Sequence, residues 1–138
     1  MASFVKYQKG VEALLEGINA GSDTWKIALS NRTPVVATDA TLTDAVEISA
    51  TNGYTAGGNA ATTASSTQTG GVYKLVLNSP STWTASGGSI GPFQYAILYD
   101  ATTNNLIGYW DYGSTVTLSV GEQFSVVLDG SNGVFTVS

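Results

Sequence analysis

The chain has 138 residues with a net charge of −5, and only 11% of its residues are charged, less than half the usual proportion. It contains no histidine and no cysteine, so it lacks the residues on which acid–base catalysis, thiol chemistry and transition-metal binding mostly depend. The length fits one domain spanning residues 1–138. We therefore expect a structural or binding protein rather than an enzyme, with no cofactor and no bound metal.

Charge and hydropathy also limit the partners. The chain has five basic residues, none of them after Lys74, and this pattern is a poor one for binding a phosphate backbone, so we expect no nucleic-acid partner. No run of about 18 apolar residues is present, and we expect no membrane span. Glu12 and Glu16 interrupt the apolar stretch 11–18, which argues against a secretory signal.

Residues 1–20 predict the one amphipathic helix of the chain. Apolar residues recur there at the spacing of a single helical face, namely at Tyr7, Val11, Leu14, Leu15 and Ile18. Ser3 is a suitable N-cap, and the stretch 17–21, which starts and ends with glycine, supplies the stop. Two interpretations stay open: a helix that docks on its own sheet, or an arm that docks on a neighbouring subunit with Phe4 and Tyr7 as its anchors.

After the helix the pattern changes to the two-residue period of a strand. Segment 24–30 alternates in this way, with one face formed by Trp25, Ile27 and Leu29. Segment 41–48 fits a short helix and a strand equally well, and 52–59 is rich in turn-forming glycine. Segment 60–70 consists almost entirely of Ala, Thr, Ser and Gln, and we expect an edge strand or an extended loop there.

The second half of the chain predicts a series of short strands. Turn-forming residues separate them, and the expected strands lie within 72–78, 82–85, 93–99, 106–112, 115–120, 122–128 and 134–137. The two-residue period places four apolar residues on one face, namely Phe93, Tyr95, Ile97 and Tyr99. About eight short strands at this spacing predict an all-β fold, an antiparallel β-sandwich of jelly-roll type with one N-terminal helix.

Oxygen donors near one predicted hairpin raise two chemical alternatives. Asp100 and Asp111 flank the hairpin, and Asn104 and Asn105 lie in its turn. A glycosidase needs two facing carboxylates, but nothing in the pattern pairs these two. The four residues also lack the spacing of an EF-hand. A calcium ion near Asp100 and Asp111 is therefore left open rather than predicted.

Three aromatic residues of the same hairpin, Tyr109, Trp110 and Tyr112, form the candidate binding surface. Exposed Tyr and Trp stack on sugar rings and anchor protein interfaces, whereas buried ones belong to a sandwich core. Neighbouring residues of a strand alternate between its two faces. We therefore expect at least one of the three side chains on the outer face.

Four motifs carry a resemblance to a known protein family. They lie at 24–31 (TWKIALSN), 52–58 (NGYTAGG), 88–93 (GSIGPF) and 107–113 (IGYWDYG). In these motifs, and in the close at 129–133 (DGSNG), the chain resembles the small β-rich virion proteins of tailed bacteriophages, of the capsid cement or decoration type. The resemblance covers most of the chain, and the family has no catalytic residues to carry over.

The resemblance implies a structural role. A protein of this type binds the major capsid protein on the outer surface of the head and stabilises it, and it assembles in the host cytoplasm. The resemblance also implies association with itself, and we expect a homotrimer because a trimer matches the local threefold positions of an icosahedral shell. Tail and fibre proteins share this composition, so the alternative is an adhesion module that binds host-surface carbohydrate through Tyr109, Trp110 and Tyr112.

Overall fold

The computed structural model describes residues 2–138, which form two short helices and ten strands. Along the chain these are β1 (Val5–Lys6), α1 (Gln8–Glu16), β2 (Trp25–Ser30), α2 (Leu42–Ala45), β3 (Asn59–Ala60), β4 (Thr63–Thr69), β5 (Val72–Leu77), β6 (Trp83–Thr84), β7 (Ile90–Asp100), β8 (Asn105–Leu118), β9 (Gln123–Phe124) and β10 (Phe135–Val137). Neither helix reaches the length and apolar character that a membrane-spanning helix needs.

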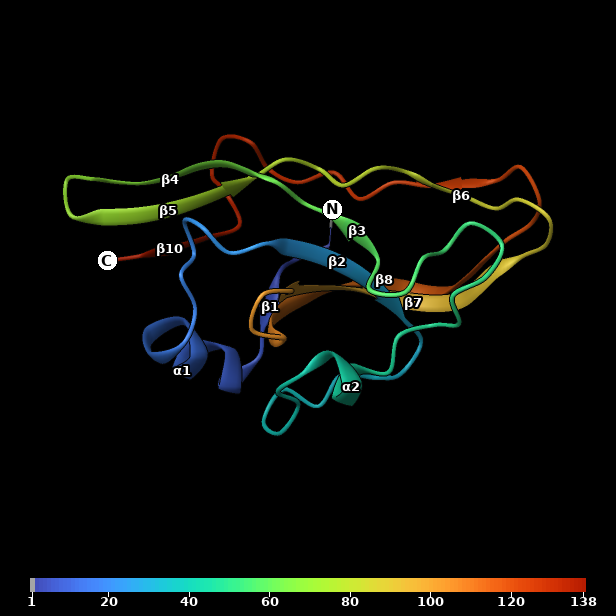
Figure 1. The fold of residues 1–138 in the computed structure, drawn as a ribbon, viewed down its shortest axis with the longest axis horizontal. Coiled ribbons are helices and arrows are strands. Elements are labelled where there is room, and N and C mark those ends of the chain that lie inside the picture. The colour runs from blue at the N-terminus through green and yellow to red at the C-terminus, as the bar shows by residue number, and fades with distance from the viewer. Residues whose placement is uncertain (1) are drawn as a thin grey trace.

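The strands form a sandwich of two layers (Figure 1). One layer is a five-stranded sheet in the order β1-β8-β7-β2-β3. The other layer combines a three-stranded sheet, β10-β5-β4, with the two-stranded pair β6-β9. All of these pairings are antiparallel. The prediction of an all-β antiparallel sandwich with an N-terminal helix is therefore confirmed, whereas this strand order does not confirm the jelly-roll topology.

The main hydrophobic core lies between the two layers. The inner face of β2 is buried as its alternation predicts, because every second side chain points across the sandwich. The largest side chains of this core come from both layers and include Trp25, Ile27, Leu29, Leu75, Trp83, Phe93, Leu98 and Ile90. The core therefore ties strands together that are far apart in the chain.

A second core lies on the other face of the five-stranded sheet, where α1 and α2 cover it (Figure 1). It consists of Tyr7, Ala28, Ala45, Tyr95, Ile97, Tyr99 and Leu106. Gly10 makes the close approach of α1 possible, because a Cβ at this position would lie 2.5 Å from the carbonyl oxygen of Leu106. The glycine that lowers the helix propensity of α1 thus lets the helix pack directly on β8.

The start of α1 differs from the prediction. The helix begins at Gln8 with Tyr7 in the N-cap position, so Ser3 is not the cap. The expected stop is correct, because α1 ends with Gly17 as its C-cap. The predicted apolar face is only partly covered: Tyr7, Leu14 and Ile18 pack on the cores, whereas Val11 and Leu15 are 41% and 80% exposed.

A register shift between β7 and β8 changes which side chains share a face. Phe93 is paired with Val116, but Tyr95, only two residues later, is paired with Asp111. Two steps along β7 here face five along β8, so the ladder is locally disrupted and the regular alternation of β7 does not continue through this point. Phe93 therefore enters the core between the layers while Tyr95 faces the second core. The expectation that Phe93 shares a face with the later apolar residues of β7 is wrong for this reason.

The remaining segments resolve the open alternatives. Segment 41–48 contains the short helix α2, and at its start the Thr41 N–H donates to the Asp44 carboxylate over 3.0 Å. Segment 60–70 contains the edge strand β4. Two separate strands were expected within 106–120, but the chain forms one long strand there, β8. The irregular pairing opposite Gln94 bends this strand, and no turn interrupts it.

The glycine-rich motif at 52–58 packs against β2. The Tyr54 hydroxyl accepts a hydrogen bond from the Leu29 N–H (3.0 Å) and donates one to the Glu47 carboxylate (2.8 Å). Burial raises the pKa of Tyr54 well above its ordinary value. Gly58 has a φ of 77°, and a Cβ there would collide with the carbonyl oxygen of Ile27. These residues of the motif therefore build the turn and the core.

Candidate functional site

The sandwich is open along one side, where a groove separates the edges of its two layers. One wall is formed by the N-terminal segment, α1, β7 and β8, and the other by the stretch 124–137. Three adjoining hollows of about 270, 160 and 500 Å³ make up the groove. Trp110 lines the first two, and Phe4 lines the second and third, so the hollows are neighbours along this side. We call this feature the edge groove.

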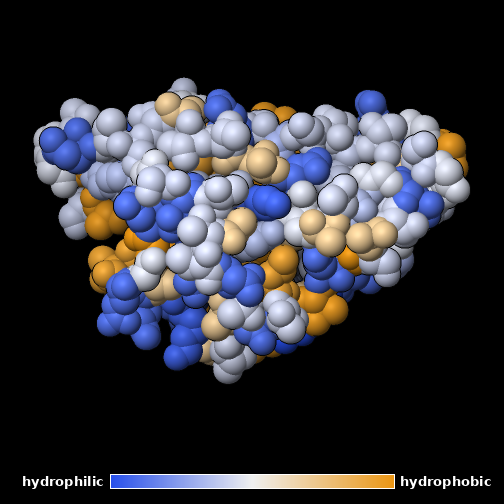
Figure 2. Space-filling model, in the orientation of Figure 1, coloured by the Kyte–Doolittle hydropathy of each residue, from blue (hydrophilic) through white to orange (hydrophobic). Residues whose placement is uncertain are grey.

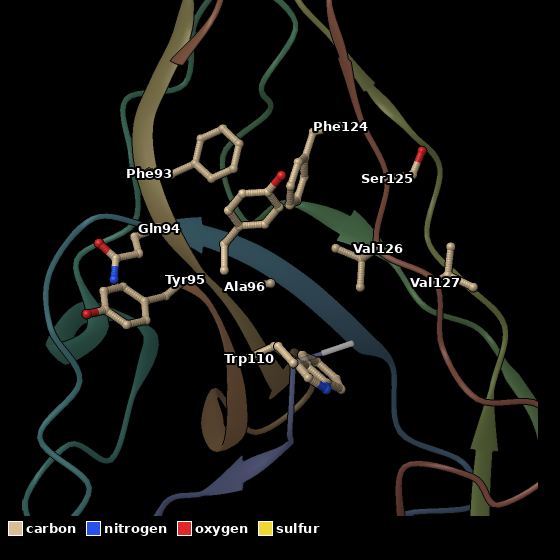
Figure 3. Close-up of a pocket in the computed structure, with 11 residues that line it drawn as sticks. Phe93, Gln94, Tyr95, Ala96, Trp110, Phe124, Ser125, Val126 and Val127 are labelled. Carbon is tan, nitrogen blue, oxygen red and sulfur yellow. The ribbon is translucent and has the colours of Figure 1, made fainter. Parts of the chain in front are cut away.

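Aromatic side chains form the first hollow of the edge groove. Figure 3 shows Phe93 and Phe124 facing each other at one end and Trp110 at the other. The rings of Phe93 and Phe124 meet edge to face with centroids 4.9 Å apart, and the Tyr112 ring packs on Phe124 at 5.7 Å. Such edge-to-face pairs are the favoured geometry for aromatic rings. They hold this end of the groove in a defined shape.

The opposite wall of the first hollow, residues 125–127, is extended but poorly paired. Within residues 2–138, no backbone–backbone hydrogen bond involves these three residues. Burial alternates along this wall: Val126 is partly buried against the core, whereas Val127 is 66% exposed. An extended segment with free backbone groups and exposed apolar side chains is typical of a surface that pairs with another chain.

The second hollow contains the N-terminal residues of the chain itself. The Phe4 ring packs on the Trp110 ring with centroids 4.9 Å apart. It also covers Gly108, where a Cβ would overlap the ring. Ala2 lines both this hollow and the first. Phe4 therefore has a seat on β8 that depends on the absence of a side chain at Gly108.

The third hollow is the largest and has an apolar rim. It lies between α1 and β1 on one side and β10 on the other. Val5, Val11 and Val137 line it and stay exposed, and Leu15 follows Val11 one turn along α1. Figure 2 shows hydrophobic atoms gathered in the notch between α1 and the layer that holds β10. A cluster of this kind marks an interaction surface more often than scattered single residues do.

The edge groove carries little charge. Among its described lining residues only Lys6 and Asp129 are charged. The Asp129 carboxylate accepts hydrogen bonds from the N–H groups of Asn132 (2.9 Å) and Ser131 (2.8 Å), which hold the pKa of Asp129 below its ordinary value. The Asp129 carboxylate is therefore already hydrogen-bonded by residues of its own turn. The groove suits an apolar or neutral partner surface better than a charged one.

The structure separates the residues that the sequence put forward as candidate sites. Phe4, Trp110 and Tyr112 come together in the edge groove. Tyr7 and Tyr109 lie on the opposite face of β8, where their ring centroids are 5.5 Å apart. Tyr7 is fully buried, and burial raises its pKa well above the ordinary value. The three aromatic residues 109, 110 and 112 therefore do not form one flat platform.

The carboxylates of the predicted hairpin lie far apart. Asp100 is paired with Asn105 at the turn, whereas Asp111 is paired with Tyr95, five positions away along β7. At the rise of a strand this separation is about 17 Å. Within residues 2–138 no group of three or more acidic side chains is arranged to hold a metal ion. A calcium site that uses both Asp100 and Asp111 is excluded by this distance.

Asp100 is nevertheless unusual, because its carboxyl group is fully buried. One oxygen accepts hydrogen bonds from the N–H groups of Thr102 (2.8 Å) and Thr103 (3.2 Å). The other oxygen is buried without a hydrogen-bond partner, and burial, together with the neighbouring Asp23, raises the pKa of Asp100 to about 6.

Sequence reasoning missed the second wall of the edge groove. Phe124, Val126 and Val127 were expected to form an ordinary strand, and only Gln123 and Phe124 do so. The sequence predicted a strand within 122–128, but no sequence signal shows that this segment stands beside an open sheet edge. Comparisons of the chain with protein-family models, with curated proteins and with solved structures yield no match.

Proposed function

We propose that this protein is a structural virion protein, a decoration protein that binds the outside of a tailed-phage head and stabilises it. The observation that carries the proposal is the edge groove. It is a long, largely uncharged and aromatic surface on a chain with few charges to repel neighbours. A surface of this kind suits adhesion to another protein, since interface cores are enriched in aromatic residues and depleted in charge.

The family resemblance supports the same proposal. In the motif 52–58, glycines are required because a Cβ at Gly53 or Gly58 would collide with neighbouring backbone atoms. The motif 107–113 contains Gly108, on which Phe4 packs, and two residues that line the edge groove, Trp110 and Tyr112. The residues that carry the resemblance are thus the ones that build the fold and the edge groove. This is what a family of adhesive shell proteins without catalytic residues requires.

The mechanism would be adhesion at several points. Each copy would cover a seam between major capsid subunits, and a closed oligomer would multiply weak contacts through a raised effective concentration. Closed cyclic symmetry is the usual arrangement for identical subunits, and a homotrimer matches the local threefold positions of a shell. In this proposal the protein acts on the outer surface of the virion after assembly in the host cytoplasm.

The alternative, a tail or fibre module that binds carbohydrate, has less support. A glycan platform needs exposed, coplanar rings, but Phe4 covers Trp110 and Tyr109 faces the opposite side of β8. Tyr112 alone is largely exposed, at 59%. A single exposed ring offers one stacking contact, which is little for a sugar-binding site.

Binding to purified expanded heads that lack the protein tests the proposal. We expect the protein to cosediment with the heads, to saturate at a fixed ratio to the major capsid protein, and to raise the temperature at which the heads rupture. V127D places a charge in the edge groove and should weaken binding, whereas T67D places the same charge on the exposed strand β4 and should not. Failure to bind heads, together with binding to a host-surface polysaccharide, would favour the alternative.

A further inference from the structure

The N-terminal arm, residues 2–6, forms part of the wall of the edge groove in its own chain. Val5 and Lys6 form β1 and are paired with Tyr109 and Gly108 of β8. The Phe4 ring occupies its seat on Trp110, and Ala2 reaches the first hollow. The edge of β8 therefore offers a site for this particular segment, whichever copy of the chain supplies it.

The arm is joined to the rest of the molecule by a fixed point directly after it. The Tyr7 N–H donates to the carbonyl oxygen of Ile107 and the Gln8 N–H to that of Val36, each over 2.9 Å, and the Tyr7 side chain is buried. Only the two-residue pairing of β1 and the Phe4 seat hold the arm itself. Five extended residues reach about 16 Å, which is enough to cross to a subunit that touches this edge.

The surface around the arm is more apolar than an isolated molecule needs. The exposed residues Val5, Val11 and Val137 line the third hollow, and the exposed Leu15 follows Val11 one turn along α1. Intramolecular packing leaves two residues of the predicted apolar face of α1 uncovered, although they continue the stripe that includes Leu14. A second copy placed against this edge would cover them at the same point where the arm leaves the body.

We propose that the arm is exchanged between copies: residues 2–6 of one copy pair with β8 of the next and complete its edge groove, with Phe4 on the neighbour's Trp110 and Gly108. This inference rests on the self-association included in the proposed function, and it names the surface responsible. Exchange reproduces the same contacts between chains that the arm makes within one chain, so it costs little. A head-to-tail exchange closes into a ring, and its symmetry decides the number of subunits.

Single-cysteine variants test the exchange directly, because the chain has no native cysteine. Val5 and Tyr109 face each other in the register of β1 and β8, and facing Cα atoms of antiparallel strands lie within disulfide range. V5C and Y109C are unfolded together, refolded as a mixture and oxidised. An exchanged arm produces a disulfide between the two different chains, whereas an arm kept in its own groove produces none.

A matched control uses T67C and K74C, which face each other across the β4–β5 hairpin. Their short turn keeps both strands in one chain, so the mixed sample should form no interchain disulfide above background. The double variant V5C/Y109C should give a ladder of covalent species on a non-reducing gel, ending at the number of subunits in the ring. The corresponding T67C/K74C double variant should run as a monomer.

The size of the wild-type protein, measured by light scattering over a range of concentrations, completes the test. An oligomer whose V5C and Y109C chains become linked supports the exchange. A monomer at all concentrations overturns it, and so does an oligomer whose arms stay in their own chains. If Y109C fails to fold, a variant with photoreactive benzoylphenylalanine in place of Phe4 can be mixed with isotope-labelled wild-type chains. Mass spectrometry of the crosslinked peptides then shows whether the arm reacts with β8 of its own chain or with β8 of a neighbour. Exchange without head binding would count against the proposed function alone.

Discussion

The seat of Phe4 on Gly108 predicts a strong energetic coupling between these two positions. Replacing Phe4 by Ala removes a partly buried ring and its contact with Trp110. A fully buried Phe buries 150–250 Å², and half of that area at 25 cal/mol/Å² gives about 2 kcal/mol, to which the aromatic pair adds up to about 1 kcal/mol. We therefore expect Phe4→Ala to lower the free energy of unfolding by about 2 to 3 kcal/mol.

Gly108→Ala should cost nearly as much in the wild-type background. The new Cβ would overlap the Phe4 ring, and the ring must leave its seat because the backbone of β8 is fixed on both sides by β7 and β1. The φ of Gly108 is not positive, so alanine itself is not strained there. In the Phe4→Ala background the same substitution should therefore be neutral, or stabilising by about 0.5 kcal/mol through the lower entropy of the unfolded chain.

Urea unfolding followed by tryptophan fluorescence measures all four corners of this cycle at one protein concentration. The account predicts that the double variant is about as stable as Phe4→Ala alone, which is a coupling energy of about 2 kcal/mol. Additive effects, with the double variant about 4 kcal/mol below wild type, would refute the statement that Phe4 rests on Gly108.

Two further predictions concern parts of the fold outside the edge groove. Gly58→Ala should lower the free energy of unfolding by about 3 kcal/mol or more, because its φ of 77° is unfavourable for alanine and a Cβ would collide with the Ile27 carbonyl oxygen. Gly70 has a φ of 60° but lies in open space, so Gly70→Ala should cost only about 1 kcal/mol. Equal effects of the two substitutions in denaturant unfolding would contradict this reasoning. The pKa of Asp100 is raised to about 6 by burial and by the neighbouring Asp23. It lies above the ordinary value of about 4, so the folded state binds this proton more tightly than the unfolded state. The free energy of unfolding should therefore rise by about 1 kcal/mol as the pH falls from 7 to 5, Asp100→Asn should abolish that rise, and a flat wild-type profile would argue against it.

The local pattern of the sequence predicts much of this fold. The alternation of Trp25, Ile27 and Leu29 identifies both the strand and its buried face, since a strand with one covered face requires that period. The turn-rich segments likewise separate most of the strands at the correct places. These features depend on neighbours within a few residues, which is the range over which sequence patterns carry information.

The errors arise where long-range pairing decides the outcome. Phe93 changes face because of a bulge against Val116, and nothing in the local alternation indicates that bulge. Val11 and Leu15 belong to an apolar stripe but stay exposed, because Gly10 brings a different side of α1 onto β8. These errors concern the relative placement of elements that are distant in the chain.

The candidate site was predictable only in part. Trp110 and Tyr112 stood out as aromatic residues of a hairpin, and Phe4 as part of an apolar start. Their meeting in one groove follows from β1 being paired with β8 and from the 124–128 segment lying across the open edge. Tyr7 and Tyr109 fall on the other face because adjacent strand residues alternate. A sequence pattern names such residues, but only the sheet order shows which of them share a surface.

The most direct test of the central claim is the number of copies of this chain in one purified virion, measured by quantitative mass spectrometry against the major capsid protein. The account predicts a ratio comparable to that of the capsid subunit, since a decoration protein covers the whole shell. A handful of copies per particle would contradict shell decoration and indicate a tail or a vertex, and complete absence from the particle would contradict any virion role.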